Sequence, residues 1–581
     1  MSVNSKKRDL ASEKLASGSL IDRRALVHGG ALLAGGTVAA ALLPPFSTRE
    51  SASAAALPAM NGDPIVASDK KAVVETSAGK IRGYTRNGIY TFKGIPFGAS
   101  TEGDARFMPP TKPAPWAGLR SSMQYEHVAP QGPRSGWAND EEAWMFSWDD
   151  GIQGEDCLRV NIWTPSINDN KRRPVMVWLH GGGFVAGSGQ ELRSYDGENL
   201  CKRGDVVVVS LNHRLGVLGY LDLSNYGDAY ASSANVGMLD IVLALEWVRE
   251  NIGNFGGNSA NVTIFGQSGG GGKVNTLMAM PSAKGLFHRA ITQSGSTLRV
   301  GVHEKSAKLA AAVLSELGLS DSQVSQLHTL PFERLVAAGV AVTQRNARPG
   351  PPDFRRLADQ LGWVPVVDGK IVPQHPFDPS APAISSDVPL LVGTVLNEFL
   401  TAINHPEYES MTEEAVAKRV SDVYGNKSAH VIDVFRQAHP GAKPFDILSL
   451  IFAAPVRQAA VTQAERKAAL GAAPAYLYWF TWQTPVLDGR PRAFHCSELA
   501  FCFDNTDRCE NMTGGGPEAR ALASKVSEAW LAFARSGNPN HGGLPEWPIF
   551  TAEECPTMRF DKVSSVENNP DGVERKAIAE A

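Results

Sequence analysis

Continuous apolar runs, each bounded by glycine or polar residues, mark the middle of the chain. Three of them, at residues 174–179, 205–211 and 261–265, are rich in valine and other strand-forming residues. Runs without polar alternation are typical of strands that are buried on both faces of a sheet. Residues 238–248 repeat apolar positions with helical spacing and contain no glycine or proline. This alternation of strands and helices predicts an α/β fold with a mostly parallel central sheet flanked by helices.

The same pattern continues toward the C-terminus. Further strands are expected at residues 389–393 and 475–480, which are again apolar. Residues 305–361 have a mainly helical pattern with breaks at prolines, and we expect helical insertions of this kind to cap the sheet. No convincing linker divides residues 66–570. We therefore expect one large domain over that range.

The first 56 residues differ in composition from the rest of the chain. A basic segment ending in Arg23 and Arg24 precedes an apolar, Gly/Ala-rich stretch at residues 25–43, and small residues follow at 51–56. This order is typical of a signal peptide with its cleavage region. The paired arginines resemble the twin-arginine export signal of bacteria, so residues 1–56 are expected to direct export to the periplasm or the medium. A retained membrane anchor is the alternative, although repeated glycine makes a poor spanning helix.

Composition and charge exclude few other classes of protein. Of the 581 residues, 43% are hydrophobic and 20% are charged, and the formal net charge is −4, which argues against nucleic acid as the main partner. No metal-ligand cluster or dinucleotide fingerprint occurs, so neither a metal nor a cofactor is expected. Too few cysteines are present for a disulfide scaffold, although pairing of Cys502 with Cys509 remains open. The six cysteines are Cys157, Cys201, Cys496, Cys502, Cys509 and Cys555.

One glycine-rich stretch, FGQSGGGGK at residues 265–273, has two interpretations. A phosphate-binding loop needs G-x-x-x-x-G-K-[ST], but Gln267 stands where the first glycine belongs and Val274 stands where the hydroxyl belongs. The pattern G-x-S-x-G, after a strand and before a helix, fits residues 266–270 and puts Ser268 on a sharp turn. The glycines relieve crowding across that turn, and the following helix directs its N-terminus at the site. Ser268 is therefore the candidate nucleophile.

A longer match around this serine indicates a family. Residues 255–270 resemble the serine signature of the type B carboxylesterases, which include the cholinesterases and bacterial para-nitrobenzyl esterases. The resemblance runs over residues 72–560. It implies the α/β-hydrolase fold and hydrolysis of small-molecule carboxylic esters through an acyl-enzyme. Further matching pieces are EDCLRVNIW at 155–163, FKGIPF at 92–97, RFMPP at 106–110, NHRLG at 212–216 and NVGMLD at 235–240.

A second glycine cluster supplies the donors that acyl transfer needs. HGGGF at residues 180–184 follows a predicted strand, where an α/β-hydrolase places its oxyanion loop. By resemblance, Gly182 and Gly183 donate N–H groups from this loop, and Gly269 donates from the serine turn. His180 is expected to be a structural hydrogen-bonding residue rather than a base.

The chain order serine, acid, histidine selects the other two members of the triad. GTVLNE at residues 393–398 resembles the acid loop of the family and selects Glu398, while AFHCSELAF at 493–501 resembles its histidine segment and selects His495. Glu398 is expected to hold the tautomer of His495 and to stabilise the imidazolium that forms. Glu498 is the next candidate acid and is otherwise a supporting or capping carboxylate.

Several residues beside the triad depart from the family pattern or have an open role. Ser294 matches a family serine that supports the acid–base pair, and a purely structural role is equally open. Gln267 replaces the usual glutamate beside the nucleophile, Phe399 replaces the glycine after the acid, and Cys496 replaces the glycine after the histidine. Cys157 lacks its usual partner and is expected to be a buried free thiol.

Three functions are compatible with these residues. A serine hydrolase of carboxylic esters uses all of them, whereas a binding or adhesion protein on the same fold has no need to keep them. An amidase or lactonase keeps the chemistry and changes the leaving group. The aromatic-rich insertion at residues 136–148 either lines the site or packs as a surface flap, and a lining role favours neutral aryl or alkyl esters. The intact triad favours a serine hydrolase over a binding protein, and it does not distinguish an ester from an amide or lactone as substrate.

Overall fold

The computed structural model describes residues 64–133, 139–346 and 362–581. The described residues therefore do not include the proposed signal segment at residues 1–56. They also leave out the first part of the aromatic-rich insertion and the end of the helical region at 305–361. Residues 62–581 make up one compact unit.

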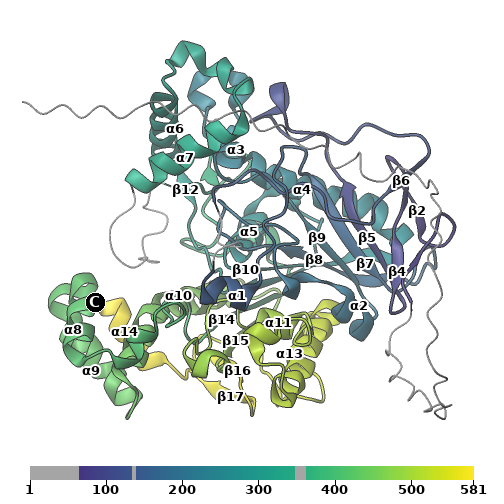
Figure 1. Cartoon of the computed structure of the whole chain (residues 1–581). Helices are drawn as coiled ribbons and strands as arrows, with labels where there is room; N and C mark the ends of the chain where they lie inside the picture. Colours follow the sequence, from purple (N-terminus) through teal and green to yellow (C-terminus); the bar gives the residue numbers. More distant parts are fainter. Residues whose placement is uncertain (1–63, 134–138, 347–361) are drawn as a thin grey trace, which may run out of the picture. The chain divides into compact units, whose positions relative to one another are not determined.

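Within the described residues, twelve strands form one large sheet. Its central strands are parallel, and antiparallel strands complete both edges, so the prediction of a mostly parallel central sheet is confirmed (Figure 1). The parallel strands, in spatial order, are β9 (Val207–Leu211), β8 (Arg173–Leu179), β10 (Gly257–Gln267), β11 (Arg289–Gln293), β14 (Leu390–Val395), β15 (Ala475–Phe480) and β16 (Pro556–Phe560). The edge strands are β1 (Val66–Ala67), β4 (Tyr84–Arg86), β5 (Ile89–Pro96), β7 (Arg159–Thr164) and β17 (Ser565–Asn568).

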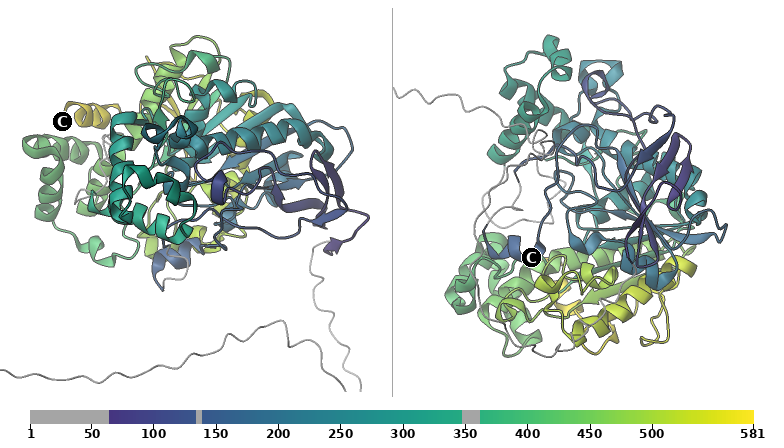
Figure 2. Two further views of the ribbon diagram at one scale, coloured as in Figure 1. Left: turned by 90° about the horizontal axis from the view of Figure 1, so that it is seen from above. Right: turned by 45° about the vertical axis from the view of Figure 1, so that its right-hand side comes forward.

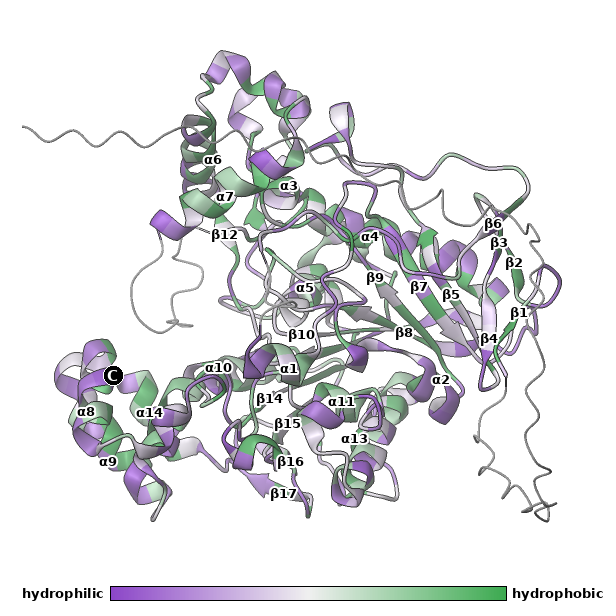
Figure 3. Cartoon of the chain, viewed as in Figure 1, coloured by the Kyte–Doolittle hydropathy of each residue, from purple (hydrophilic) through white to green (hydrophobic). Residues whose placement is uncertain are grey.

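Helices cover both faces of this sheet. Along β8, Val175 and Val177 pack into one apolar core, while Met176 and Trp178 pack into a second core on the other face. Burial on both sides explains why the strand sequences are continuously apolar, and the hydrophobic colouring of Figure 3 follows β8 and β9. The first core contains residues of α4 (Val236–Asn251), α5 (Gly269–Ala279) and α10 (Pro444–Ala468), and the second contains residues of α2 (Glu198–Gly204), α11 (Leu499–Cys502) and α13 (Pro517–Ser536).

Two helical insertions interrupt the strand–helix alternation. The first contains α6 (His303–Leu317) and α7 (Phe332–Arg345), which pack on each other and beside α3 (Gly216–Tyr220). The second contains α8 (Glu413–Tyr424) and α9 (Ser428–Ala438), which pack on each other, and α9 also lies against α14 (Gly572–Glu580); Figure 2 shows the two groups in teal and green. The remaining elements are α1 (Glu141–Phe146), α12 (Glu510–Thr513), a three-stranded sheet of β2 (Val73–Thr76), β3 (Gly79–Arg82) and β6 (Leu119–Ser121), and the pair β12 (Gly301–Val302) and β13 (Val366–Val367).

Two described helical stretches are long and apolar enough to cross a membrane, at Asp228–Phe255 and Pro444–Ala468. Of their most apolar windows, 78% and 61% respectively are buried inside the fold. They contain α4 and α10, which cover the sheet, so their hydropathy reflects core packing.

Two of the family-like sequence pieces contact each other through a buried ion pair. Arg106 donates from Nε and Nη2 to the two carboxylate oxygens of Glu155 at 2.6 and 2.5 Å. Arg214 forms a similar fork on Asp240, at 2.9 and 2.7 Å, and joins the NHRLG piece to α4. Bidentate pairs of this kind fix both distance and orientation. These motif residues therefore hold loops in place.

Candidate active site

Ser268 lies between β10 and α5 on the turn that the sequence predicts. Its backbone has φ 57° and ψ −125°, a conformation that non-glycine residues rarely adopt. The flanking glycines allow it: a Cβ on Gly266 would lie 2.5 Å from the carbonyl carbon of Gly270, and one on Gly270 would lie 2.0 Å from the oxygen of Leu179. The strained turn exposes the serine side chain at the end of the strand.

The predicted oxyanion loop follows β8 and lies against this turn. Gly182 and Gly183 have φ of 76° and 63°, where a side chain would be strained. The oxygen of Gly182 accepts hydrogen bonds from the N–H groups of Val185 and Ala186 at 3.3 and 3.1 Å. Because this oxygen and the N–H of Gly183 belong to one planar peptide, these bonds also orient that N–H.

On the serine side, the first turn of α5 fixes another peptide. The oxygen of Ser268 accepts a hydrogen bond from the N–H of Gly272 at 3.1 Å. The same peptide carries the N–H of Gly269, which is thereby oriented by the helix. A Cβ on Gly269 would lie 2.2 Å from the oxygen of Gly183, so glycine permits the close approach of loop and turn.

The predicted acid and base are in direct contact. Nδ1 of His495 lies 2.6 Å from Oε2 of Glu398, whose side chain is fully buried. Oε1 of Glu398 accepts a further hydrogen bond from the N–H of Val395 at 3.2 Å. A β-bridge between Asn397 and Phe494 holds the two loops together. With Nδ1 donating to Glu398, Nε2 of His495 is left to accept a proton.

Ser268, Glu398 and His495 line one cavity of about 620 Å³. No hydrogen bond between the Ser268 hydroxyl and His495 occurs among the described residues, and such contacts are often long without substrate. Aromatic side chains contribute much of the wall, including two from the predicted insertion. They are Phe146, Trp148, Tyr195, Phe399, Tyr408 and Phe494. Within the described part of the insertion, Phe146 and Trp148 line the cavity, whereas Trp144 is exposed.

The three residues that depart from the family pattern lie around His495. Gln267 and Phe399 contact its ring, and Cys496 follows it in the chain and contacts Gln267. The amide nitrogen of Gln267 lies 3.1 Å from Nε2 and 3.4 Å from Nδ1 of His495, so it lies over the ring face. The rings of Phe399 and His495 have centroids 4.0 Å apart. Burial raises the pKa of the Cys496 thiol, which stays protonated and donates to Oε1 of Gln267 at 3.2 Å. These three side chains therefore lie together around the base.

Glu498 and Ser294 lie near the triad without joining it. Glu498 is buried, accepts a hydrogen bond from Gln293 at 3.3 Å, and has its pKa raised to about 8 by burial and then by the charge of Glu398. It is thus neutral at neutral pH and unsuited to stabilising an imidazolium. The hydroxyl of Ser294 is buried and makes no hydrogen bond to any described residue. Its predicted support of the acid–base pair stays a prediction.

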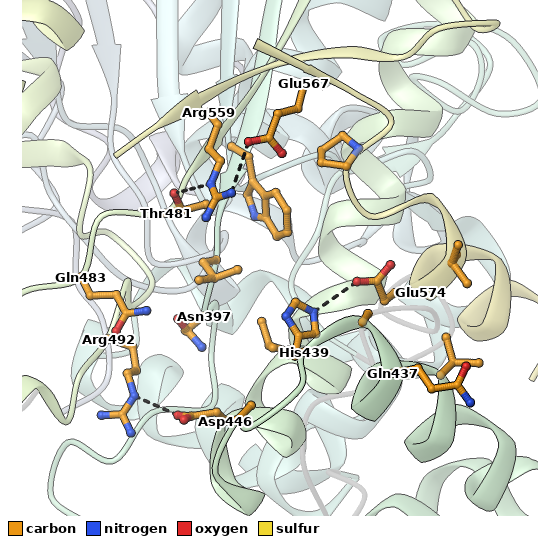
Figure 4. A pocket seen from close by; sticks show the side chains of 18 residues that line it. Asn397, Gln437, His439, Asp446, Thr481, Gln483, Arg492, Arg559, Glu567 and Glu574 are labelled. Atoms are coloured by element: carbon orange, nitrogen blue, oxygen red, sulfur yellow. Dashed lines mark hydrogen bonds and ion pairs between the residues drawn. The ribbon is translucent and has the colours of Figure 1, made fainter. Parts of the chain in front are cut away.

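A second cavity, of about 790 Å³, contains many charged side chains (Figure 4). They pair across it: His439 lies 3.2 Å from Glu574, and Arg492 lies 2.9 Å from Asp446. Ser268 is not among the lining residues. The candidate chemistry therefore belongs to the cavity described above.

Part of that first cavity is formed by residues that no motif indicated. Glu191 and Leu192 line it from the segment after the oxyanion loop, and Leu400 and Thr401 line it from the segment after the acid. The helices α6 and α7, which the sequence suggested as a cap, contribute no described residue to its wall. Cavity walls depend on how distant loops pack, and that information is absent from local patterns.

The six cysteines are all free thiols, and Cys157 is buried as predicted. Cys502 and Cys509 are likewise unpaired and buried. Groups of three or more histidine, cysteine, aspartate or glutamate side chains that could hold a metal ion are not found in the part of the chain that the structure describes.

The sheet, the strained serine turn and the loop after β8 define an α/β-hydrolase. Residues 70–576 match the carboxylesterase family, and the chain belongs to that family and is a carboxylic ester hydrolase. It is 34% identical over 517 residues to the para-nitrobenzyl esterase of Bacillus subtilis, covering 87% of this chain and 98% of that one. It is 32% identical over 490 residues to the phenmedipham hydrolase of Pseudarthrobacter oxydans, covering 83% and 93%.

Solved structures show the same relationship. An esterase from the anaerobe Clostridium hathewayi, described as able to hydrolyse aliphatic aromatic polyesters, superposes with a TM-score of 0.75 at 36% identity. The match covers 89% of this chain and 99% of that chain. The similarity thus extends over nearly the whole described fold.

Proposed function

We propose that this carboxylesterase acts through an acyl-enzyme formed on Ser268. His495 removes the hydroxyl proton as Oγ attacks the ester carbonyl carbon, and then gives that proton to the departing alcohol. Glu398 holds the imidazole in the productive tautomer and stabilises its charged form. Water then repeats the attack, with His495 again as the base, and releases the acid. The observation that carries this proposal is the 2.6 Å contact of Glu398 with His495 in the cavity that contains Ser268.

In this mechanism three backbone N–H groups bind the oxyanion of the tetrahedral intermediate. Those of Gly182, Gly183 and Gly269 are the candidates, since each belongs to a peptide whose carbonyl oxygen is held by hydrogen bonds. Donors fixed before the reaction need no reorganisation when charge develops. A binding protein on this fold has no use for that arrangement.

Neutral aryl or alkyl esters are the proposed substrates. The aromatic wall of the cavity suits an apolar acyl or alcohol group. The names of two relatives, a para-nitrobenzyl esterase and an esterase of aliphatic aromatic polyesters, agree with this class. An amide or lactone would need the same triad, and a panel that varies only the leaving group separates these possibilities.

Covalent labelling tests the mechanism. A fluorescent organophosphonate should label Ser268, and Ser268→Ala should lose both the label and the esterase activity. Ser315→Ala, which changes an exposed serine on α6, is the matched control and should keep both. Full esterase activity in folded Ser268→Ala would refute the proposed mechanism.

We also propose that residues 1–56 form a twin-arginine-type signal and that the mature enzyme acts outside the cytoplasm, without a stable membrane span. The support is the order of basic, apolar and small residues in the sequence.

A further inference from the structure

Lys273 ends the FGQSGGGGK stretch, and neither a phosphate loop nor the triad accounts for it. It lies in α5, one turn beyond Ser268, and its side chain is fully buried. Burying a lysine is costly unless its nitrogen finds acceptors. The partners of this nitrogen therefore indicate why the residue is there.

Those partners are carbonyl oxygens of the oxyanion loop. Nζ of Lys273 donates to the oxygen of His180 at 2.8 Å and lies 3.4 Å from the oxygen of Gly181. The nitrogen also lies 5.9 Å from the ring centroid of Phe184, the residue after Gly183. One side chain on α5 thus contacts the oxyanion loop at both of its ends.

The contact with Gly181 determines the direction of an N–H group. The oxygen of Gly181 and the N–H of Gly182 belong to one planar trans peptide and point in opposite directions. Nδ1 of His180 lies 3.0 Å from the same oxygen and helps to hold it. A peptide whose oxygen is held toward Lys273 must direct the N–H of Gly182 away from Lys273. Among the described residues, loss of the lysine would leave this oxygen held by His180 alone and would remove the donor on the α5 side.

We propose that Lys273 is a positioning residue that keeps the N–H of Gly182 directed at the oxyanion of the intermediate. This role rests on the proposed acyl-enzyme mechanism. It completes a set in which each candidate donor is held through the carbonyl of its own peptide: Gly182 by Lys273, Gly183 by the N–H groups of Val185 and Ala186, and Gly269 by the N–H of Gly272.

Burial lowers the pKa of Lys273 to about 7, against an opposing contribution from Glu191. Both protonation states retain N–H donors, so the contact with the loop persists when the side chain titrates. The role therefore depends on donation rather than on a fixed charge.

The chain offers a matched control for a buried lysine. Lys467 on α10 is also fully buried, and its Nζ donates to the carbonyl oxygens of Ser385 and Ser386 at 3.0 and 2.8 Å. Burial lowers its pKa to about 8. It does not line the cavity that contains Ser268. Lys467→Met removes the same kind of buried donor as Lys273→Met, but away from the oxyanion loop.

The experiment measures kcat and KM for a para-nitrophenyl ester. It also measures inhibition by an alkyl trifluoromethyl ketone, to whose carbonyl Ser268 adds, leaving an oxyanion. Lys273→Met should lower kcat by about tenfold or more and weaken the ketone by a similar factor, with KM within about twofold. Lys467→Met should leave all three unchanged. Unchanged kcat in folded Lys273→Met, or equal losses of kcat in both variants, would overturn the role.

A second variant covers the case in which Lys273→Met does not fold. Lys273→Gln keeps a polar group, but its amide nitrogen is one bond closer to the backbone and does not reach both carbonyl oxygens. We expect kcat to fall by about threefold or more at unchanged KM, and wild-type kcat would overturn the role. Ser268→Ala distinguishes failure of the mechanism from failure of this role. If folded Ser268→Ala is active, the mechanism and the role of Lys273 are both overturned. If Ser268→Ala is inactive but the Lys273 variants are fully active, only the role of Lys273 is overturned.

Discussion

The carboxylate of Glu398 lies 2.6 Å from Nδ1 of His495, although 97 residues separate the two in the chain. Topology brings them together. Glu398 follows β14 and His495 follows β15, and these strands are parallel neighbours in the sheet. Loops that follow adjacent parallel strands emerge at the same edge, which is where α/β folds place their sites. The helices α8, α9 and α10 lie between the two strands in the chain, and both loops still emerge at this edge.

Removing either member of this pair should impair turnover. His495→Ala removes the base, and we expect kcat to fall by at least about three orders of magnitude. Glu398→Gln keeps the shape but presents the wrong partner to Nδ1, so a severe loss is expected with little change in KM. Steady-state kinetics on a para-nitrophenyl ester measures both. Near-wild-type turnover in Glu398→Gln would require another acid, and neutral Glu498 would have to be reconsidered.

Glu498 should make a contribution to stability that is lost as pH rises. Its pKa is raised from 4.5 to about 8, first by burial and then by the charge of Glu398. Between these values Glu498 holds a proton in the folded protein that it has released in the unfolded chain, so its own contribution to the free energy of unfolding decreases by about 1.4 kcal/mol per pH unit. Above the folded pKa the decrease ends.

Urea unfolding of the wild type and of Glu498→Gln between about pH 5 and pH 7 checks this. The glutamine variant cannot titrate at this position, so the free energy of unfolding of the wild type minus that of the variant should decrease by that amount per pH unit. The same pH dependence in both proteins would contradict the assignment of a neutral Glu498.

Local patterns predict the serine turn well because its requirements are local. Gly266 and Gly270 are needed at that turn whatever the rest of the chain does. Boundaries are less certain from sequence: residues 205–211 predict one strand, yet Asp205 has φ 47° and ends α2, and β9 begins at Val207. A valine run shows that a strand exists, but the helix before it decides where the strand starts.

Local sequence patterns do not predict the contacts around His495. The sequence marked Gln267, Phe399 and Cys496 as three separate departures, whereas in the structure they gather on one imidazole and its neighbour. For Lys273 the sequence offers only the phosphate-loop interpretation. Its actual partners, two carbonyl oxygens about ninety residues away, depend on how α5 packs against the loop after β8.

Export gives a prediction that involves the N-terminal segment alone. Replacing Arg23 and Arg24 by lysine should leave precursor in the cytoplasm, because the twin-arginine route reads the arginine pair. Cell fractionation with activity measurements checks the location, and N-terminal sequencing of the exported protein should place the start between Ala54 and Met60. An intact N-terminus in the membrane fraction would support the anchor instead.

The last prediction concerns Gln267 and the charge of the substrate. A carboxylate beside the nucleophile attracts a cationic alcohol group, whereas a neutral amide offers only a weaker dipole. In this chain the amide is also held in place, because Oε1 accepts from Cys496 and the amide nitrogen faces His495. We therefore expect no marked preference for cationic esters.

The measurement compares kcat/KM for a choline ester with that for its uncharged isostere, which has a tert-butyl group in place of trimethylammonium. The wild type should hydrolyse the choline ester no faster than the isostere. Gln267→Glu should move the ratio toward the cation, since a carboxylate near an ammonium group is worth about 1 kcal/mol even in water. Gln267→Met is the control, because it removes the dipole without adding charge. A wild-type preference of about tenfold for the choline ester would contradict this reasoning. It would point to Glu142 or Glu191, which line the same cavity as carboxylates besides the triad acid Glu398.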